Sequence, residues 1–178
     1  GKGLFVKEIE SHILSGDIDI GVHSMKDMPA KSHDELEIFC LMERLDNSDV
    51  LISNNGKKLL NLESGAVVGT SSIRRRAQIL NLRRDLKIKL LRGNVDTRIR
   101  KLKNKEYDAI ILAYAGLKRL GMESEITEKL DQRTFLPAGG QGLVGMQSKK
   151  NSMYRKLFNK INVEASEMAN IAERSFLK

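Results

Sequence analysis

The sequence of 178 residues predicts an α/β fold, because short apolar segments alternate with helical ones along most of its length. Strand candidates at 66–69 and 87–91 are each followed by a polar loop and then by a helix, and the candidate at 108–113 leads through Gly116 into a short helix. The helical period is clearest at 73–82 and 95–103. Strands that alternate with helices at this spacing predict mostly parallel sheets with helices on their faces.

The N-terminal segments fit the same fold class. Residues 4–15 have the period of an amphipathic helix, and 17–24 alternates as a half-buried strand does. Further strands are predicted at 36–42 and 49–53. The charged residues between these two strands lack a clear period, so we interpret them as a crossing between two domains.

The C-terminal part of the chain is less regular. A short helix is predicted to end at Leu120, and a glycine-rich return connection follows at 136–142. From 152 to 178 the sequence reads as helical nearly throughout. We therefore expect the return connection to close the second domain.

The composition and the single cysteine restrict the class of protein. Hydrophobic residues make up 40% and charged residues 30%, which is typical of a globular protein rather than a disordered one. No segment approaches the roughly 20 apolar residues that a membrane-spanning helix needs. Cys40 is the only cysteine, so no internal disulfide can form, and a reducing compartment is favoured. We expect a cytoplasmic protein that does not bind membranes.

The net charge of +8 favours an anionic partner. Nucleic acid is one candidate, since the run Arg74–Arg76 could contact phosphates, and such binding would weaken steeply with salt. Against it, aromatic residues make up only 4% and there is no Trp, so base-stacking platforms are scarce. The arginines recur near the starts of helices, which favours a small polyanion.

Two strand-to-helix junctions carry arginines. At the first, Thr70, Ser71 and Ser72 precede a helix whose first turn contains Arg74 and Arg75. Unpaired N–H groups and the helix dipole favour an anion there. A helix N-cap with solvated arginines explains the same residues equally well. This junction alone therefore does not decide between a binding site and a cap.

The second junction repeats the arrangement with Arg92, Gly93 and Arg98. Because a guanidinium group binds a carboxylate through two parallel hydrogen bonds, two such loops predict a ligand with several carboxylates. Arg119 adds a third basic position, where a cation at the end of a helix is the simpler explanation.

Lys26 and Asp27 follow a predicted strand. An isolated pair of this kind is more often a solvated turn, but the carboxyl ends of strands are where α/β sheets bind ligands. The literal G-x-G-x-x-G match at 140–145 does not open a strand–turn–helix unit, so a dinucleotide site is not predicted. The histidines lack metal-ligand spacing with Cys40 or with one another, so no metal site is predicted.

Seven stretches match one known family in order and spacing over nearly the whole chain. They are residues 1–8, 23–27, 69–75, 91–95, 107–113, 115–121 and 136–142. On these stretches the chain resembles the porphobilinogen deaminases (hydroxymethylbilane synthases). These transferases of tetrapyrrole and heme biosynthesis deaminate four porphobilinogen molecules and join them into linear hydroxymethylbilane.

The resemblance implies three domains, of which the first two are α/β domains like type II periplasmic binding proteins, with the ligand site between them. The first would comprise 1–45 and 136–163, and the second 46–135. Residues 164–178 would be the first helix of a third, α+β domain. The family's first strand and helix would precede Gly1, so the chain resembles a fragment that also lacks most of the third domain.

The resemblance also implies roles for particular residues. Asp27 matches the catalytic carboxylate, which assists loss of ammonia from porphobilinogen and stabilises positive charge on pyrrole nitrogens. The positions that bind the acetate and propionate side chains of cofactor and substrate match Ser24, Lys26, Thr70, Ser72, Arg74, Arg75, Arg92, Gly93, Arg98 and Arg119. No metal is implied.

The family carries a dipyrromethane cofactor, thioether-linked to a cysteine of the third domain. That cysteine follows the motif that begins here at 172–174 and would lie beyond Lys178, so Cys40 is not assigned its role. We therefore expect no turnover from this chain alone. Separately, we expect the protein to be a monomer. The alternative is a binding module for a small polyanion. Asp27 argues against it, because a carboxylate does not help to bind carboxylates.

Overall fold

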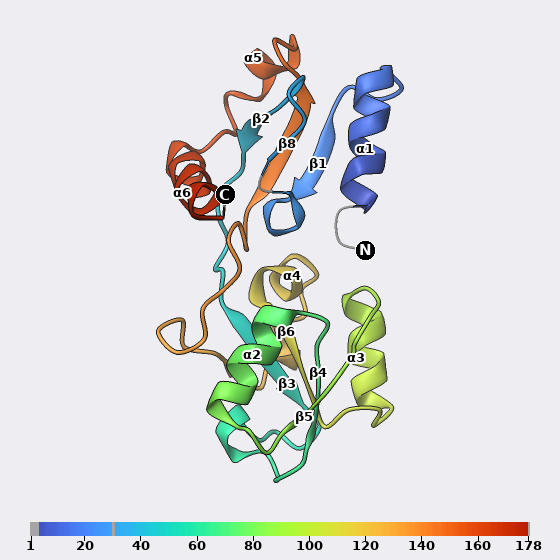
Figure 1. Cartoon of the computed structure of the whole chain (residues 1–178), viewed down its shortest axis with the longest axis vertical. Coiled ribbons are helices and arrows are strands. Elements are labelled where there is room, and N and C mark those ends of the chain that lie inside the picture. Colours follow the sequence, from blue (N-terminus) through green and yellow to red (C-terminus); the bar gives the residue numbers. More distant parts are fainter. Residues whose placement is uncertain (1–3, 30, 178) are drawn as a thin grey trace. The chain divides into compact units, whose positions relative to one another are not determined.

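The structure, a computed structural model, describes residues 4–29 and 31–177. The chain divides into two compact units, whose elements are labelled in Figure 1. Unit 1 comprises Gly1–Leu45 and Ala138–Lys178, and unit 2 comprises Asp46–Pro137. The chain thus passes between the units at the charged connector and at the glycine-rich return connection.

Unit 1 is built on a three-stranded sheet of order β1–β8–β2. Helix α1 packs on β1 and β8, whereas α5 and α6 contact β2 (Figure 1). The elements of this unit are α1 (Leu4–Ser15), β1 (Gly21–Ser24), the 3-10 helix η1 (Met25–Asp27), β2 (Leu36–Leu41), β8 (Val144–Lys149), α5 (Tyr154–Phe158) and α6 (Glu164–Phe176).

The described strand pairs of unit 1 are antiparallel, so the prediction of mostly parallel strands is wrong for this sheet. Strand β2 leads outward through Leu45, whose N–H donates to the carbonyl of Gly142 (3.3 Å) just before β8 begins. The outgoing and returning segments therefore run side by side in opposite directions. Sequence patterning misses β8, because buried Gln147 and Ser148 interrupt its apolar residues.

Unit 2 contains a five-stranded sheet of order β5–β4–β6–β3–β7. Strand β4 pairs in parallel with β5 and β6, as predicted, whereas β3 is antiparallel to β6 and β7. The elements are β3 (Asp49–Ser53), η2 (Leu59–Asn61), β4 (Val67–Gly69), α2 (Ile73–Leu82), β5 (Lys87–Lys89), α3 (Val95–Lys103), β6 (Ala109–Ala113), α4 (Tyr114–Arg119), η3 (Glu123–Glu125) and β7 (Glu128–Lys129). The parallel strands are those of the strand–helix repeat. Strand β3 precedes this repeat in the chain and pairs antiparallel with its last strand, β6.

Both faces of the unit 2 sheet are covered at its central strand, β6. In β6, Ile111 belongs to one hydrophobic cluster with Ile79 of α2. The neighbouring Ile110 belongs to a second cluster, with Ile99 of α3 and Leu117 of α4. Because successive side chains of a strand point to opposite faces, the unbroken apolar run of β6 is what a sheet covered on both sides requires.

The C-terminal residues differ from the predicted continuous helix. They form α5 and α6, separated by residues 159–163. Helix α6, which we expected to open a third domain, groups with unit 1. There Arg44 binds Glu173 of α6 through two hydrogen bonds of 2.5 and 3.1 Å. The assignment of residues 164–178 to a third domain stays a prediction.

Candidate functional site

The turn that carries Asp27 lies directly after β1. Ser24 ends that strand, and Lys26 and Asp27 belong to η1. Met25, which is buried, anchors the turn through its N–H, which donates to the carbonyl of Leu143 (3.1 Å). The Asp27 side chain is exposed and that of Lys26 is half-buried. The strand end thus presents a carboxylate at the surface of unit 1 on a turn with a fixed backbone.

Gly140 packs against the backbone of this turn. Its φ of +71° lies in the left-handed region, which glycine adopts without steric cost. A Cβ at this position would stand 2.8 Å from the carbonyl carbon of Met25 and 3.0 Å from the nitrogen of Lys26. The glycine-rich connection therefore supports the Asp27 turn from behind, at a distance that only glycine allows.

Arg44 and Glu173 hold the glycine-rich connection in turn. Besides its two bonds to Glu173, Arg44 donates through Nε to the carbonyl of Gln141 (3.1 Å). Oε2 of Glu173 also accepts the N–H of Gly140 (2.6 Å). Sequence reasoning missed this pair, because its members are 129 positions apart and are joined only by the fold. The one available signal was that Glu173 lies in the motif at 172–174, which the sequence resemblance singled out.

In unit 2, the hydroxyl groups before α2 bind the local backbone. Ser72 is the N-cap of α2, and its Oγ accepts the N–H of Arg75 (3.4 Å). Oγ1 of Thr70 accepts the N–H of Ser72 (3.1 Å), and the hydroxyl of Ser71 donates to the carbonyl of Leu91. The N-cap interpretation is therefore confirmed for Ser72. Anion binding at this helix start stays a prediction.

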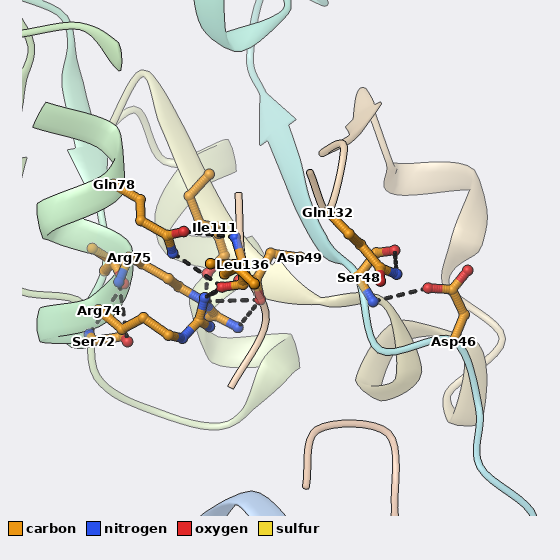
Figure 2. Close-up of polar contacts among 11 residues, drawn as sticks. Asp46, Ser48, Asp49, Ser72, Arg74, Arg75, Gln78, Ile111, Gln132 and Leu136 are labelled. Carbon is orange, nitrogen blue, oxygen red and sulfur yellow. Dashed lines mark hydrogen bonds and ion pairs between the residues drawn. The ribbon is translucent and has the colours of Figure 1, made fainter. Parts of the chain in front are cut away.

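The arginines of this turn are not simply solvated (Figure 2). Arg75 donates through Nε and Nη2 to Oδ1 of Asp49 (3.1 and 2.7 Å) and through Nη1 to the carbonyl of Ile111 (3.0 Å). Nη1 of Arg74 forms an ion pair with Oδ2 of Asp49 (2.7 Å) and donates to the carbonyl of Leu136. Arg75 is buried, whereas the Arg74 side chain keeps 26% of its surface exposed. Arg74 is therefore the better placed of the two for a ligand.

Asp49 remains ionised between these arginines although it is fully buried. Burial is the largest influence and would raise the pKa of Asp49, but Arg75 and Arg74 together outweigh it and lower that pKa below its ordinary value. One carboxylate between two guanidinium groups leaves a net positive charge at the start of α2. That charge suits an anionic ligand.

The second junction is built around Gly93, whose φ is +122°. Asn94 caps α3 by accepting the N–H of Thr97 (2.9 Å), and Nε of Arg98 donates to the carbonyl of Gly93 (2.7 Å). A Cβ at Gly93 would lie 2.7 Å from Cγ2 of Thr97. Arg92 beside it is exposed. The loop therefore holds Arg98 close to the backbone and presents Arg92 to solvent.

The predicted site residues fall into two groups. Unit 1 holds Ser24, Lys26 and Asp27 in one turn. In unit 2, the loops after the adjacent parallel strands β4 and β5 lie together, joined by the Ser71–Leu91 hydrogen bond. Arg119 stands apart from these loops in sequence, exposed at the end of α4. The residues of the second group are Thr70, Ser72, Arg74, Arg75, Arg92, Gly93, Arg98 and Arg119.

Cys40 is buried, and its thiol donates to the carbonyl of Phe158 (3.8 Å). Burial raises the pKa of this thiol, so little thiolate forms near neutral pH, and Cys40 is a poor nucleophile.

Within residues 4–29 and 31–177, no cluster of side chains is suited to hold a metal ion. Over the same residues, no helix has the length and apolar character needed to cross a membrane.

The fold is that of type II periplasmic-binding-protein-like α/β domains, as predicted. Three solved structures resemble it at 14% identity: a BvgS VFT2 domain of Bordetella pertussis (TM-score 0.54, covering 97% of this chain and 73% of that one), a substrate binding domain from Clostridium difficile (0.54, 94% and 80%) and a lipoprotein from Bacillus subtilis (0.53, 94% and 74%). At this identity the likeness shows the fold alone.

Sequence relatives narrow this class to one family. The family model described as porphobilinogen deaminase, dipyromethane cofactor binding domain, matches residues 1–156. Proteins named porphobilinogen deaminase from Geobacillus sp. (strain WCH70), Shouchella clausii and Clostridium kluyveri are 55%, 52% and 51% identical and match 100% of this chain. The chain belongs to the porphobilinogen deaminase family. It spans 58%, 58% and 61% of the length of these relatives.

Proposed function

We propose that this chain supplies the catalytic carboxylate and most of the carboxylate-binding residues of an enzyme that joins four porphobilinogen molecules into hydroxymethylbilane. The observation that carries the proposal is the family match together with an exposed carboxylate, Asp27, on a rigid strand-end turn. Because the chain spans 58% of its first relatives, the activity is proposed for the complete protein that contains it.

Asp27 would act on porphobilinogen where positive charge develops. The C–N bond of the protonated aminomethyl group breaks, ammonia leaves with the bonding electrons, and the pyrrole nitrogen donates its lone pair and becomes positive. A carboxylate held on a fixed turn stabilises that charge without reorganising. A pyrrole α-carbon then forms the new C–C bond and loses its proton. The backing by Gly140 and Glu173 supports this role, since it fixes the turn before substrate binds.

The basic loops of unit 2 would bind the acetate and propionate groups of substrate and cofactor. Exposed Arg92, half-exposed Arg74 and the cap of α2 fit a ligand with several carboxylates. Dipyrromethane, when bound, supplies the α-carbon to which the first porphobilinogen is joined. Cys40 does not fit its thioether attachment, because the thiol is buried and hydrogen-bonded. We therefore assign the attachment to a cysteine outside this chain.

The complete protein is further proposed to be a cytoplasmic monomer that does not bind nucleic acid. Within the basic run 74–76, Arg75 is buried and donates to Asp49, so it is poorly placed to contact a phosphate. Size-exclusion chromatography with light scattering tests whether the protein is a monomer. A salt titration of DNA binding tests whether it binds nucleic acid, and steeply salt-dependent binding would contradict the proposal that it does not.

The experiment that tests the function is porphobilinogen consumption by the complete protein, after cofactor loading has been verified. We expect Asp27→Asn to reduce turnover by roughly 10²–10⁴-fold, the range for a group that transfers protons or stabilises charge in the transition state. Asp34→Asn is the matched control, since Asp34 is an exposed carboxylate in the same unit. An unmodified loaded protein that leaves porphobilinogen untouched, or an active Asp27→Asn variant, contradicts the proposal.

A further inference from the structure

Asp49 is a buried carboxylate that the proposed reaction does not use directly. It begins β3, its side chain has no exposed surface, and it contacts both arginines in the first turn of α2. Figure 2 shows Asp49 with Arg74 and Arg75 and, beside them, Gln78 and Leu136. Arg75 contacts this carboxylate through two nitrogens, whereas Arg74 contacts it through one.

Each guanidinium nitrogen of Arg75 donates to a protein group. Its Nε and Nη2 donate to Oδ1 of Asp49, and its Nη1 donates to the carbonyl of Ile111. With 8% of its side chain exposed, Arg75 has little surface through which its two remaining N–H groups could reach a carboxylate from outside. In its contact with Asp49, the Nε–Nη2 edge of Arg75 faces one carboxylate oxygen, Oδ1, with both nitrogens.

Arg74 contacts the protein through one nitrogen. Nη1 meets both Oδ2 of Asp49 and the carbonyl of Leu136. Among the described residues, the Nε–Nη2 edge of Arg74 takes part in neither contact. That edge carries two parallel N–H groups and is the one Arg75 uses on Asp49. Arg74 can therefore be held at one corner and still receive a ligand carboxylate on its side-on edge.

The second support of Arg74 is itself fixed. Gln78 donates through Nε2 to the carbonyl of Leu136 (3.0 Å) and accepts the N–H of Leu136 through Oε1 (2.6 Å). This two-bond contact orients the Leu136 carbonyl that Nη1 of Arg74 meets. An arginine side chain otherwise loses about 2 kcal/mol of rotamer freedom when a ligand orders it. Holding it beforehand reduces that cost of binding.

We propose that Asp49 is a positioning residue that holds Arg74 by Nη1, with the Leu136 carbonyl as second support, so that the Nε–Nη2 edge binds a carboxylate of porphobilinogen. This inference rests on the proposed function, because it requires Arg74 to bind a carboxylate. A purely structural Asp49 would affect stability and leave the recognition of carboxylates unchanged.

The test measures porphobilinogen binding to the complete protein by isothermal titration calorimetry, in an Asp27→Asn background that prevents turnover. Porphobilinogen and its dimethyl ester are compared, since the ester cannot pair with arginine. We expect Asp49→Asn to weaken binding of the diacid roughly tenfold, on the order of the rotamer cost that an already ordered Arg74 avoids. Binding of the ester should stay unchanged. Asp85→Asn, which breaks the exposed Arg83–Asp85 pair of the same unit, is the control and should affect neither ligand.

Asp49→Asn leaves buried Arg75 without its counter-charge, so circular dichroism must first show that the variant is folded. Gln78→Ala removes the support of Leu136 without leaving a buried charge, and we expect it to weaken diacid binding about threefold. If Arg74→Gln weakens diacid binding and folded Asp49→Asn and Gln78→Ala do not, the positioning role is overturned. If Arg74→Gln itself has no effect, the assignment of Arg74 under the proposed function fails instead. Equal losses for diacid and ester would show a structural effect only.

Discussion

Replacing Gly140 by alanine tests whether the glycine-rich connection supports the Asp27 turn. At φ +71° an alanine costs about 1–2 kcal/mol in backbone strain. Its Cβ would also stand 2.8 Å from the carbonyl carbon of Met25, which is backbone and cannot rotate away. Overpacking of this kind costs about 1–3 kcal/mol. We therefore expect Gly140→Ala to lower the free energy of unfolding by roughly 2–5 kcal/mol.

Gly16→Ala is the matched control for this prediction. Gly16 lies in the same unit with a φ of +86°, but a Cβ there would meet nothing within 4 Å. It should cost only the backbone strain. Urea unfolding followed by circular dichroism measures both variants, and amide exchange at Met25 and Lys26 reports on the turn itself. If both variants lose the same stability and exchange at the turn is unchanged, Gly140 does not support the turn.

Two further predictions concern unit 1. Glu173→Ala removes the acceptor of the Gly140 N–H and the partner of Arg44, so we expect a loss of about 1–3 kcal/mol in urea unfolding, with Glu173→Gln intermediate. Equal losses for the two variants would argue against the N–H contact. Burial lowers the pKa of His23 below its ordinary 6.5, against the opposing effects of Gln147 and Glu10. The unfolded state then takes up the proton first, so stability should fall as pH drops below about 6.5 toward the folded pKa. His23→Gln should flatten that decline between pH 7.5 and 5, and an unchanged slope would refute it.

Local pattern was sufficient for the elements whose apolar residues recur regularly or form an unbroken run. Helices α1, α2 and α3 begin and end at the predicted residues, and β6 was recognisable from its unbroken apolar run. The family resemblance supplied the candidate site residues, because those stretches are long and in register. Pattern failed at β8, where Gln147 and Ser148 are buried polar residues. Their burial depends on neighbours that are remote in sequence.

The sequence by itself determined the α/β class, the crossing near residue 46 and the basic loops, since each depends on residues that are adjacent or one helical turn apart. Only the tertiary structure decided that Arg75 faces inward, because its partner Asp49 lies 26 positions away on β3. The same holds for the support of the Asp27 turn by Gly140 and Glu173. Contacts between distant segments follow from how packed elements bring backbone and charge together, and no local pattern encodes them.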